Sequence, residues 1–115
     1  MSLKVEEYLR EDGSSPFAGW FNGLNRDAAY KVATARTRME LGNLSAVKWI
    51  GAIGKYRIDW GPGLHIYIAR DGKELVILFG GGTKKRQQAD IREAETLLAE
   101  YKRRKAEATR SAPKT

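Results

Sequence analysis

The segment from residue 75 to residue 91 constrains the fold more than any other part of the chain. It begins with five apolar residues, LVILF, passes through three glycines and continues through TKKR into a helix-like pattern. An uninterrupted apolar run of this length is typical of a central strand covered on both faces. Glycines let another group approach the backbone closely, and N–H groups at a helix start favour an anion. The segment predicts a buried strand that leads into a cationic helix start at one rim of a sheet. An alternative interpretation is a helix start with solvated lysines.

The remaining pattern predicts an α+β fold with the element order β-α-α-β-β-β-α. Ser15 before Pro16 predicts the start of a short helix, and Asn25 predicts the cap of the next one. The two helices should form a hairpin laid on the sheet. We expect strands over residues 3–8, 53–60, 64–70 and 74–79, and helices over residues 16–22, 26–41 and from 84 onward. The last helix should end near Lys102, so that residues 1–106 form the domain and residues 107–115 a polar, disordered tail.

Composition limits the function classes. The 115 residues fit one domain, and the formal charge of +7 favours a polyanionic partner, although it could serve solubility alone. The absence of cysteine and the single histidine exclude thiolate and multi-histidine metal centres, so we expect no metal and no cofactor. No apolar run is long enough for a membrane helix, and the first residues lack the apolar core of a signal peptide. We therefore expect a cytoplasmic protein without a membrane partner.

The strands over residues 53–60 and 64–70 place polar side chains on one face. With Trp60 opposite Leu64 across the turn, directly opposed side chains lie within about 5 Å at Cβ. The neighbouring strand should then contribute the apolar Val76 and Leu78 to the same face. We expect a small polar patch that consists of Lys55, Arg57, His65 and Tyr67.

Each candidate residue also has a structural interpretation. Arg57 could form a surface ion pair with Asp59, and His65 could be a hydrogen-bonded structural histidine. Tyr67 is of a type that usually packs half-buried. Asp90, in the first turns of the last helix, could complement the positive end of the helix dipole.

Three segments together resemble a known family. They are GNL at residues 42–44, YRIDWGPG at residues 56–63, and GGTKKRQ at residues 81–87 followed by DI at residues 90–91. Their order and spacing resemble the phage-derived addiction-module killer proteins, which are HigB-type toxins of the RelE/ParE superfamily. The resemblance covers roughly residues 3–101. It implies a mainly antiparallel sheet with an N-terminal helical hairpin and a C-terminal helix.

The resemblance also implies a function. It predicts the toxin of a type II toxin–antitoxin module, held inactive by a helix-turn-helix antitoxin. HigB-type toxins resemble ribosome-dependent endoribonucleases that cut mRNA without a metal, by attack of the 2′-OH on the adjacent phosphorus. Two alternatives remain: a ParE-like poison of DNA gyrase without nuclease activity, and a catalytically weakened homologue that binds the antitoxin.

The family motifs assign roles to positions of this chain. Arg57 matches the strand arginine and would contact the phosphate and the transition state. Lys84 matches the motif lysine, and Asp90 matches the helical aspartate, which could orient Lys84 or Arg57. With His65, these residues form the candidate catalytic set. The candidate RNA-binding set is Lys55, Tyr67, Lys85, Arg86 and Gln87.

The chain departs from the family pattern at the Gly-Pro-Gly turn and at the glycine motif. After the turn, Leu64 replaces a tyrosine and His65 replaces the more usual arginine; Thr83 stands where an aspartate is usual. Loss of the arginine would weaken phosphate binding, whereas a histidine could itself act as the acid or base.

Overall fold

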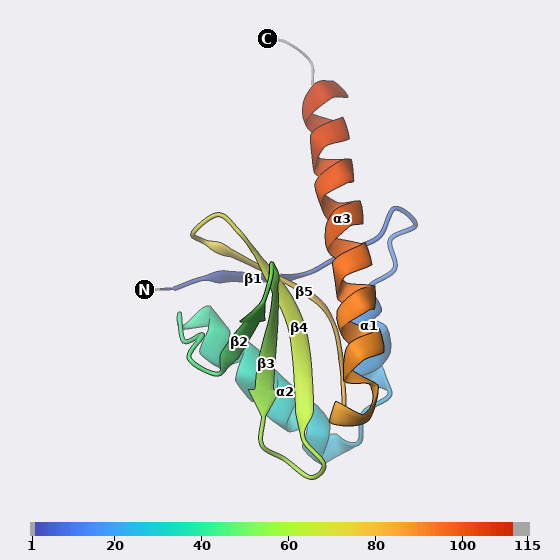
Figure 1. Cartoon of the computed structure of the whole chain (residues 1–115). Coiled ribbons are helices and arrows are strands. Elements are labelled where there is room, and N and C mark those ends of the chain that lie inside the picture. The colour runs from blue at the N-terminus through green and yellow to red at the C-terminus, as the bar shows by residue number, and fades with distance from the viewer. Residues whose placement is uncertain (1, 112–115) are drawn as a thin grey trace.

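A five-stranded mixed sheet forms the centre of the structure, a computed structural model that describes residues 2–111 (Figure 1). The strand order is β1-β5-β4-β3-β2; β1 runs parallel to β5, and the other neighbours are antiparallel. The α+β class predicted from the sequence is confirmed. The elements are β1 (Lys4–Glu7), α1 (Pro16–Asn22), α2 (Arg26–Glu40), β2 (Val47–Ile50), β3 (Ile53–Ile58), β4 (Leu64–Asp71), β5 (Leu75–Gly82), the 3-10 turn η1 (Lys84–Arg86) and α3 (Gln87–Ser111).

Both predicted helix caps of the N-terminal half are present. The Ser15 hydroxyl accepts a hydrogen bond from the Ala18 N–H at 3.0 Å, and Pro16 occupies the first helical position. The Asn25 side chain accepts from the Ala28 N–H at 2.9 Å. These bonds satisfy N–H groups that have no partner inside the helix, so α1 and α2 begin at the expected residues.

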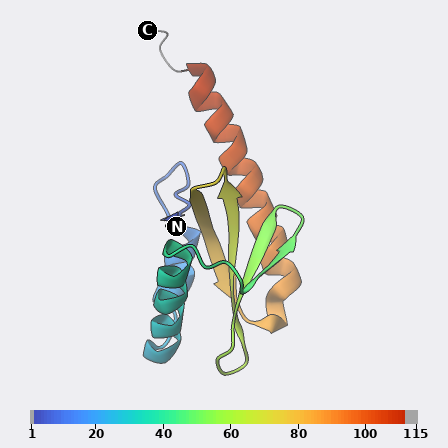
Figure 2. The ribbon, with the colours of Figure 1, turned by 90° about the vertical axis from the view of Figure 1, so that its left-hand side faces the viewer.

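Helices cover both faces of the sheet. Figure 2 shows the sheet between α2 on one side and α3 on the other. The core beneath α1 and α2 includes Phe17, Val32 and Met39, and the core beneath α3 includes Leu97 and Leu98. Between these cores lies β5, flanked by β1 and β4, with residues 76–79 all buried. The prediction of a central strand covered on both faces is confirmed.

The sequence analysis missed one strand and ended one strand and one helix too early. β5 continues through Gly82, whereas the strand was expected to end at residue 79. β2 was not predicted because it has only four residues, lies at the sheet edge and exposes Lys48 and Trp49. The predicted end of the last helix near Lys102 is wrong, since α3 continues through Ser111. The predicted disordered tail, residues 107–115, therefore overlaps the helix as far as Ser111, and residues 112–115 lie outside the described part of the chain.

The predicted pairing of β3 with β4 is also wrong. Ile58, rather than Trp60, lies opposite Leu64. The turn is longer than expected because the Trp60 N–H donates back to the Ile58 carbonyl at 3.0 Å and the Gly63 N–H to the Trp60 carbonyl at 2.8 Å. Positive φ angles at residues 61 and 63 allow this path, and both positions are glycine.

The pairing of β4 with β5 contains a bulge, and the expected position of Val76 and Leu78 is therefore wrong. The register shifts between Tyr67 and Ile68. As a result, Val76 and Leu78 lie in the core beneath α1 and α2 instead of beside the polar patch. Ile77 and Phe79 share the α3 side with Tyr67.

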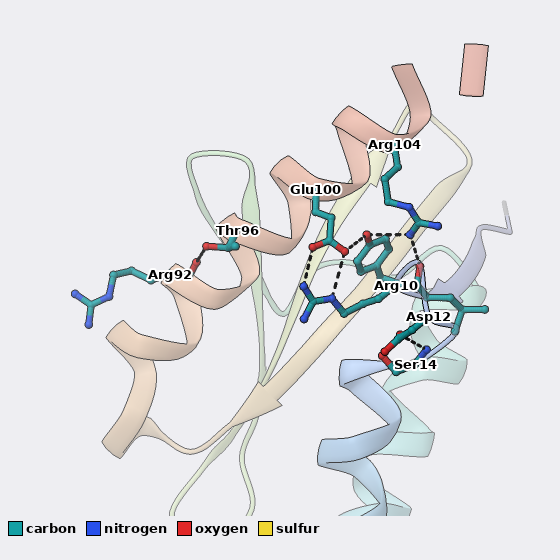
Figure 3. Close-up of polar contacts among 9 residues, drawn as sticks. Arg10, Asp12, Ser14, Arg92, Thr96, Glu100 and Arg104 are labelled. Atoms are coloured by element: carbon teal, nitrogen blue, oxygen red, sulfur yellow. Dashed lines mark hydrogen bonds and ion pairs between the residues drawn. The ribbon is translucent and has the colours of Figure 1, made fainter. Parts of the chain in front are cut away.

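Polar contacts fix α3 to the segment that follows β1 (Figure 3). The Glu100 carboxylate accepts from the Tyr8 hydroxyl at 2.7 Å and from two nitrogens of Arg10 at 2.8 and 3.2 Å. Arg104 donates to the Tyr8 hydroxyl at 3.1 Å and to the Leu9 carbonyl at 2.8 Å. This contact network orients α3 over the sheet and so positions its N-terminal turns, which carry part of the predicted site.

Candidate nucleic-acid interface

Three cations lie near one buried histidine at the rim of the sheet. In the observed register Arg57 lies opposite His65, and Lys55 lies opposite Tyr67. On the other side of β4, Gly82 lies opposite His65 and ends β5 two residues before Lys84. We call Lys55, Arg57 and Lys84 the cation cradle.

His65 is buried near the three cations, and both burial and the nearby charges act on its pKa. The side chain is 5% exposed, and its buried Nδ1 has no hydrogen-bond partner among the described residues. Burial lowers the pKa of His65, and the charges of Lys55, Arg57 and Lys84 lower it further. A lowered pKa keeps the imidazole neutral near pH 7, which is the form that accepts a proton. The charges of Arg57 and Lys84 therefore act on the same group.

The same positive charges also act on one another. The pKa of Lys55 is lowered by burial first and then by Lys48, Arg57 and Lys84. A cluster of like charges that perturbs its own members stabilises a bound anion, because the anion relieves their repulsion.

Arg57 makes the ion pair with Asp59 that the sequence allowed. Its Nε lies 3.0 Å from Asp59 Oδ1, and the two side chains are 70% and 83% exposed. Ion pairs this exposed contribute little to stability, since water screens both charges. The pair therefore leaves the guanidinium free to exchange Asp59 for a phosphate, and both interpretations of Arg57 remain compatible.

Tyr67 and Asp90 lie beneath the first turns of α3. Tyr67 is 1% exposed, and burial followed by the charge of Asp90 raises its pKa to about 12. Burial raises the pKa of Asp90, an effect that Glu93 adds to and Arg86 opposes. The expected patch is therefore divided: Lys55 and Arg57 reach the surface, whereas Tyr67 would need a movement of α3 to stack on a base. No hydrogen bond or ion pair between described residues joins Asp90 to Lys84 or Arg57, so the orienting role of Asp90 stays a prediction.

The glycine-lysine-glutamine motif forms η1 and the start of α3. Lys84, Lys85 and Arg86 are exposed, and Gln87 is half-buried. The Arg86 N–H donates to the Thr83 carbonyl, and the Gln87 N–H donates to the Lys84 carbonyl. These two N–H groups are therefore already engaged within the turn.

Sequence reasoning identified the glycines but missed their neighbours. A Cβ on Gly81 would lie 2.5 Å from the Trp20 ring, and a Cβ on Gly82 would lie 2.1 Å from Asp90 Oδ2. Trp20 comes from α1, far away in sequence, and no local pattern links it to the glycines at the end of β5. The glycines thus accommodate the protein's own side chains.

The chain has a relative in Haemophilus influenzae. It is 35% identical over 86 residues to an uncharacterized protein of strain ATCC 51907 / DSM 11121 / KW20 / Rd, and the match covers 73% of this chain and 87% of that protein. The two proteins belong to one family. No family model matches the chain.

Because the relative is uncharacterized, the residues of the rim are the basis for inferring its chemistry. The described residues contain no group of three His, Cys, Asp or Glu side chains placed to hold a metal ion. Within residues 2–111, no helix is long and apolar enough to cross a membrane. What the rim offers is a neutral imidazole among three cations, an arrangement suited to binding a phosphodiester and accepting a proton beside it.

Proposed function

We propose that this protein is the toxin of a type II toxin–antitoxin module, a ribosome-dependent mRNA endoribonuclease neutralised by a helix-turn-helix antitoxin. The observation that carries the proposal is the sheet register, which places Arg57 and Gly82 on either side of the buried His65, with Lys55 at the next pair along β3 and Lys84 two residues after Gly82. The motifs at residues 56–63 and 81–91, which resemble HigB-type toxins, support the same conclusion.

The proposed reaction needs the groups of this rim, the substrate, and a movement that admits the 2′-OH to the buried imidazole of His65. Neutral His65 takes the proton of the 2′-OH, whose oxygen then attacks the adjacent phosphorus. Arg57 and Lys84 balance the additional negative charge of the phosphorane. The P–O5′ bond breaks, and the leaving 5′-oxygen takes a proton, for which the Lys84 ammonium is the candidate donor. The products are a 2′,3′-cyclic phosphate and a 5′-OH end.

The lowered pKa of His65 fits this role. A base must be unprotonated before the reaction, and burial, followed by the charges of the cation cradle, lowers the pKa of His65 and so favours this form. A bound phosphodiester offsets part of the positive charge, so proton uptake by His65 becomes easier once substrate is present. The same cations therefore bind the substrate and adjust the base.

The test is induction of the full chain in a bacterial host, followed by mapping of transcript 5′ ends. We expect cuts in phase with codons and growth arrest, both relieved by Arg57→Ala. Lys31→Ala is the matched control, because Lys31 is an exposed cation on α2, on the opposite side of the sheet. Gyrase-linked DNA breaks without phased cuts would replace the proposal with the gyrase-poison alternative. Antitoxin binding without growth arrest would replace it with the weakened homologue.

A further inference from the structure

The edge strand β2 extends the basic face of the sheet beyond the cation cradle. Lys48 of β2 lies directly opposite Lys55 of β3, and Lys55 lies opposite Tyr67, which packs beneath α3. Opposed residues share one face of a sheet, as do residues two apart in one strand, so Lys48, Lys55 and Arg57 all lie on the α3 side. Figure 1 shows β2 and β3 beside α3 rather than beneath it. Lys48 is accordingly exposed, and it adds a further cation to the face that carries the cradle.

The pair of Lys48 and Lys55 is unfavourable in the free protein. Like charges directly opposed across two strands destabilise a sheet. Within residues 2–111 neither ammonium group forms an ion pair with a carboxylate. After burial, Lys48 is the largest cause of the lowered pKa of Lys55, so the two charges act on each other. An anion bound between them would remove this repulsion.

Protection of the sheet edge does not account for both lysines. A charged side chain on an edge strand discourages pairing with another chain. Lys48 is sufficient for that purpose on β2, whereas Lys55 lies on β3, which already has β2 and β4 as its two neighbours. The second charge therefore indicates a ligand that contacts the pair.

The spacing of the cations fits successive phosphates of one nucleic-acid strand. Arg57 lies two residues from Lys55 along β3, a separation of roughly 6.5–7 Å. One extended nucleotide covers a similar distance from phosphate to phosphate. We propose that Lys48 and Lys55 together bind a second phosphodiester of single-stranded RNA, one nucleotide from the phosphodiester at Arg57 and Lys84. This subsite rests on the proposed function, because it requires RNA at the cation cradle.

The test is binding of the full chain to a fluorescein-labelled hexaribonucleotide, measured by anisotropy at several salt concentrations. A methyl group on every 2′-oxygen removes the attacking hydroxyl, so the ligand cannot be cut, and no ribosome is present. Lys48→Ala should weaken binding several-fold at low salt, because it removes one charge of the pair. Lys48→Ala combined with Lys55→Ala should lower the slope of log affinity against log salt by about 0.7, the value for one phosphate of a single strand.

Control variants assign the effect to this pair. Lys48→Arg keeps the positive charge and should retain binding. Replacement of both Arg26 and Lys31 by alanine is the matched control for the double variant, because both are exposed cations of α2, on the other side of the sheet (Figure 2). It should leave the salt slope unchanged. Lys48 is exposed, so Lys48→Ala remains informative even if the double variant does not fold.

Four outcomes would overturn the proposal. They are the absence of saturable RNA binding, equal affinity of the wild-type and Lys48→Ala chains, an equal loss in the α2 control variant, and equal displacement of the RNA by a hexaglutamate peptide. The second would leave edge protection as the role of Lys48, the third would leave an effect of overall charge, and the last would make an acidic protein the occupant. None of them depends on cleavage or on the ribosome, so the binding test and the transcript-mapping test fail separately.

Discussion

Replacing Gly81 with alanine should destabilise the protein strongly, whereas replacing the adjacent Gly80 should not. A Cβ on Gly81 would lie 2.5 Å from two atoms of the Trp20 ring and 2.6 Å from the His65 carbonyl oxygen. A Cβ on Gly80 would meet no atom within 4 Å. The two variants differ by one position and make the same chemical change.

The magnitude follows from which atoms must move. Overpacking a core typically destabilises by about 1–3 kcal/mol. Gly81→Ala should lie near 3 kcal/mol, since one of its contacts is a backbone oxygen of β4 that is held in the sheet ladder. Gly80→Ala should be neutral or stabilise by up to about 1 kcal/mol, because alanine restricts the unfolded chain.

Urea unfolding measures the difference. With a slope of about 1.5 kcal/mol per molar, a loss of about 3 kcal/mol lowers the midpoint by about 2 M. Midpoints for Gly81→Ala and Gly80→Ala that agree within about 0.3 M would refute the reasoning. In that case the Trp20 ring would not pack against Gly81.

Three other predictions concern charged groups. Because the pKa of His65 is lowered in the native chain, the unfolded chain takes up a proton first as pH falls below about 6.5, and the free energy of unfolding should therefore decrease. Urea midpoints measured between pH 7.5 and 5.5 test this expectation. An equal decrease in the His65→Gln variant would contradict it. Lys84→Ala should lower the slope of log ribosome affinity against log salt by about 1; an unchanged slope removes Lys84 from the contact set. Glu100→Gln should weaken the contact of Tyr8 with α3, because Glu100 accepts three hydrogen bonds. It should lower the thermal midpoint more than Glu95→Gln, since Glu95 is exposed. Equal midpoints for the two variants would mean that this contact does not stabilise the fold.

Local signals were sufficient wherever one segment determined its own structure. The caps at Ser15 and Asn25 are formed within a few residues, so they identified the starts of α1 and α2. The apolar run at residues 75–79 identified a central strand, because only a strand covered on both faces can bury every side chain. The single histidine and the clustered cations followed directly from composition.

Local signals failed where the structure depends on contacts between different helices and strands. The turn at residues 59–63 closes through two backbone hydrogen bonds, and these moved the register so that His65 faces Arg57. The bulge beside Tyr67 sent Val76 and Leu78 to the other face of the sheet. β2 exists only because β3 offers it a pairing edge. Register and edge pairing depend on the energy of contacts between strands, which no single segment carries.

The sequence by itself determined the α+β class, the helix starts, the central strand and the presence of a basic rim. The tertiary structure alone decided that His65 is buried among three cations and that Tyr67 and Asp90 share a cavity with Trp20. The physical reason is burial: side chains distant in the sequence meet in a low-dielectric interior, where their charges and hydrogen-bonding groups act strongly on one another.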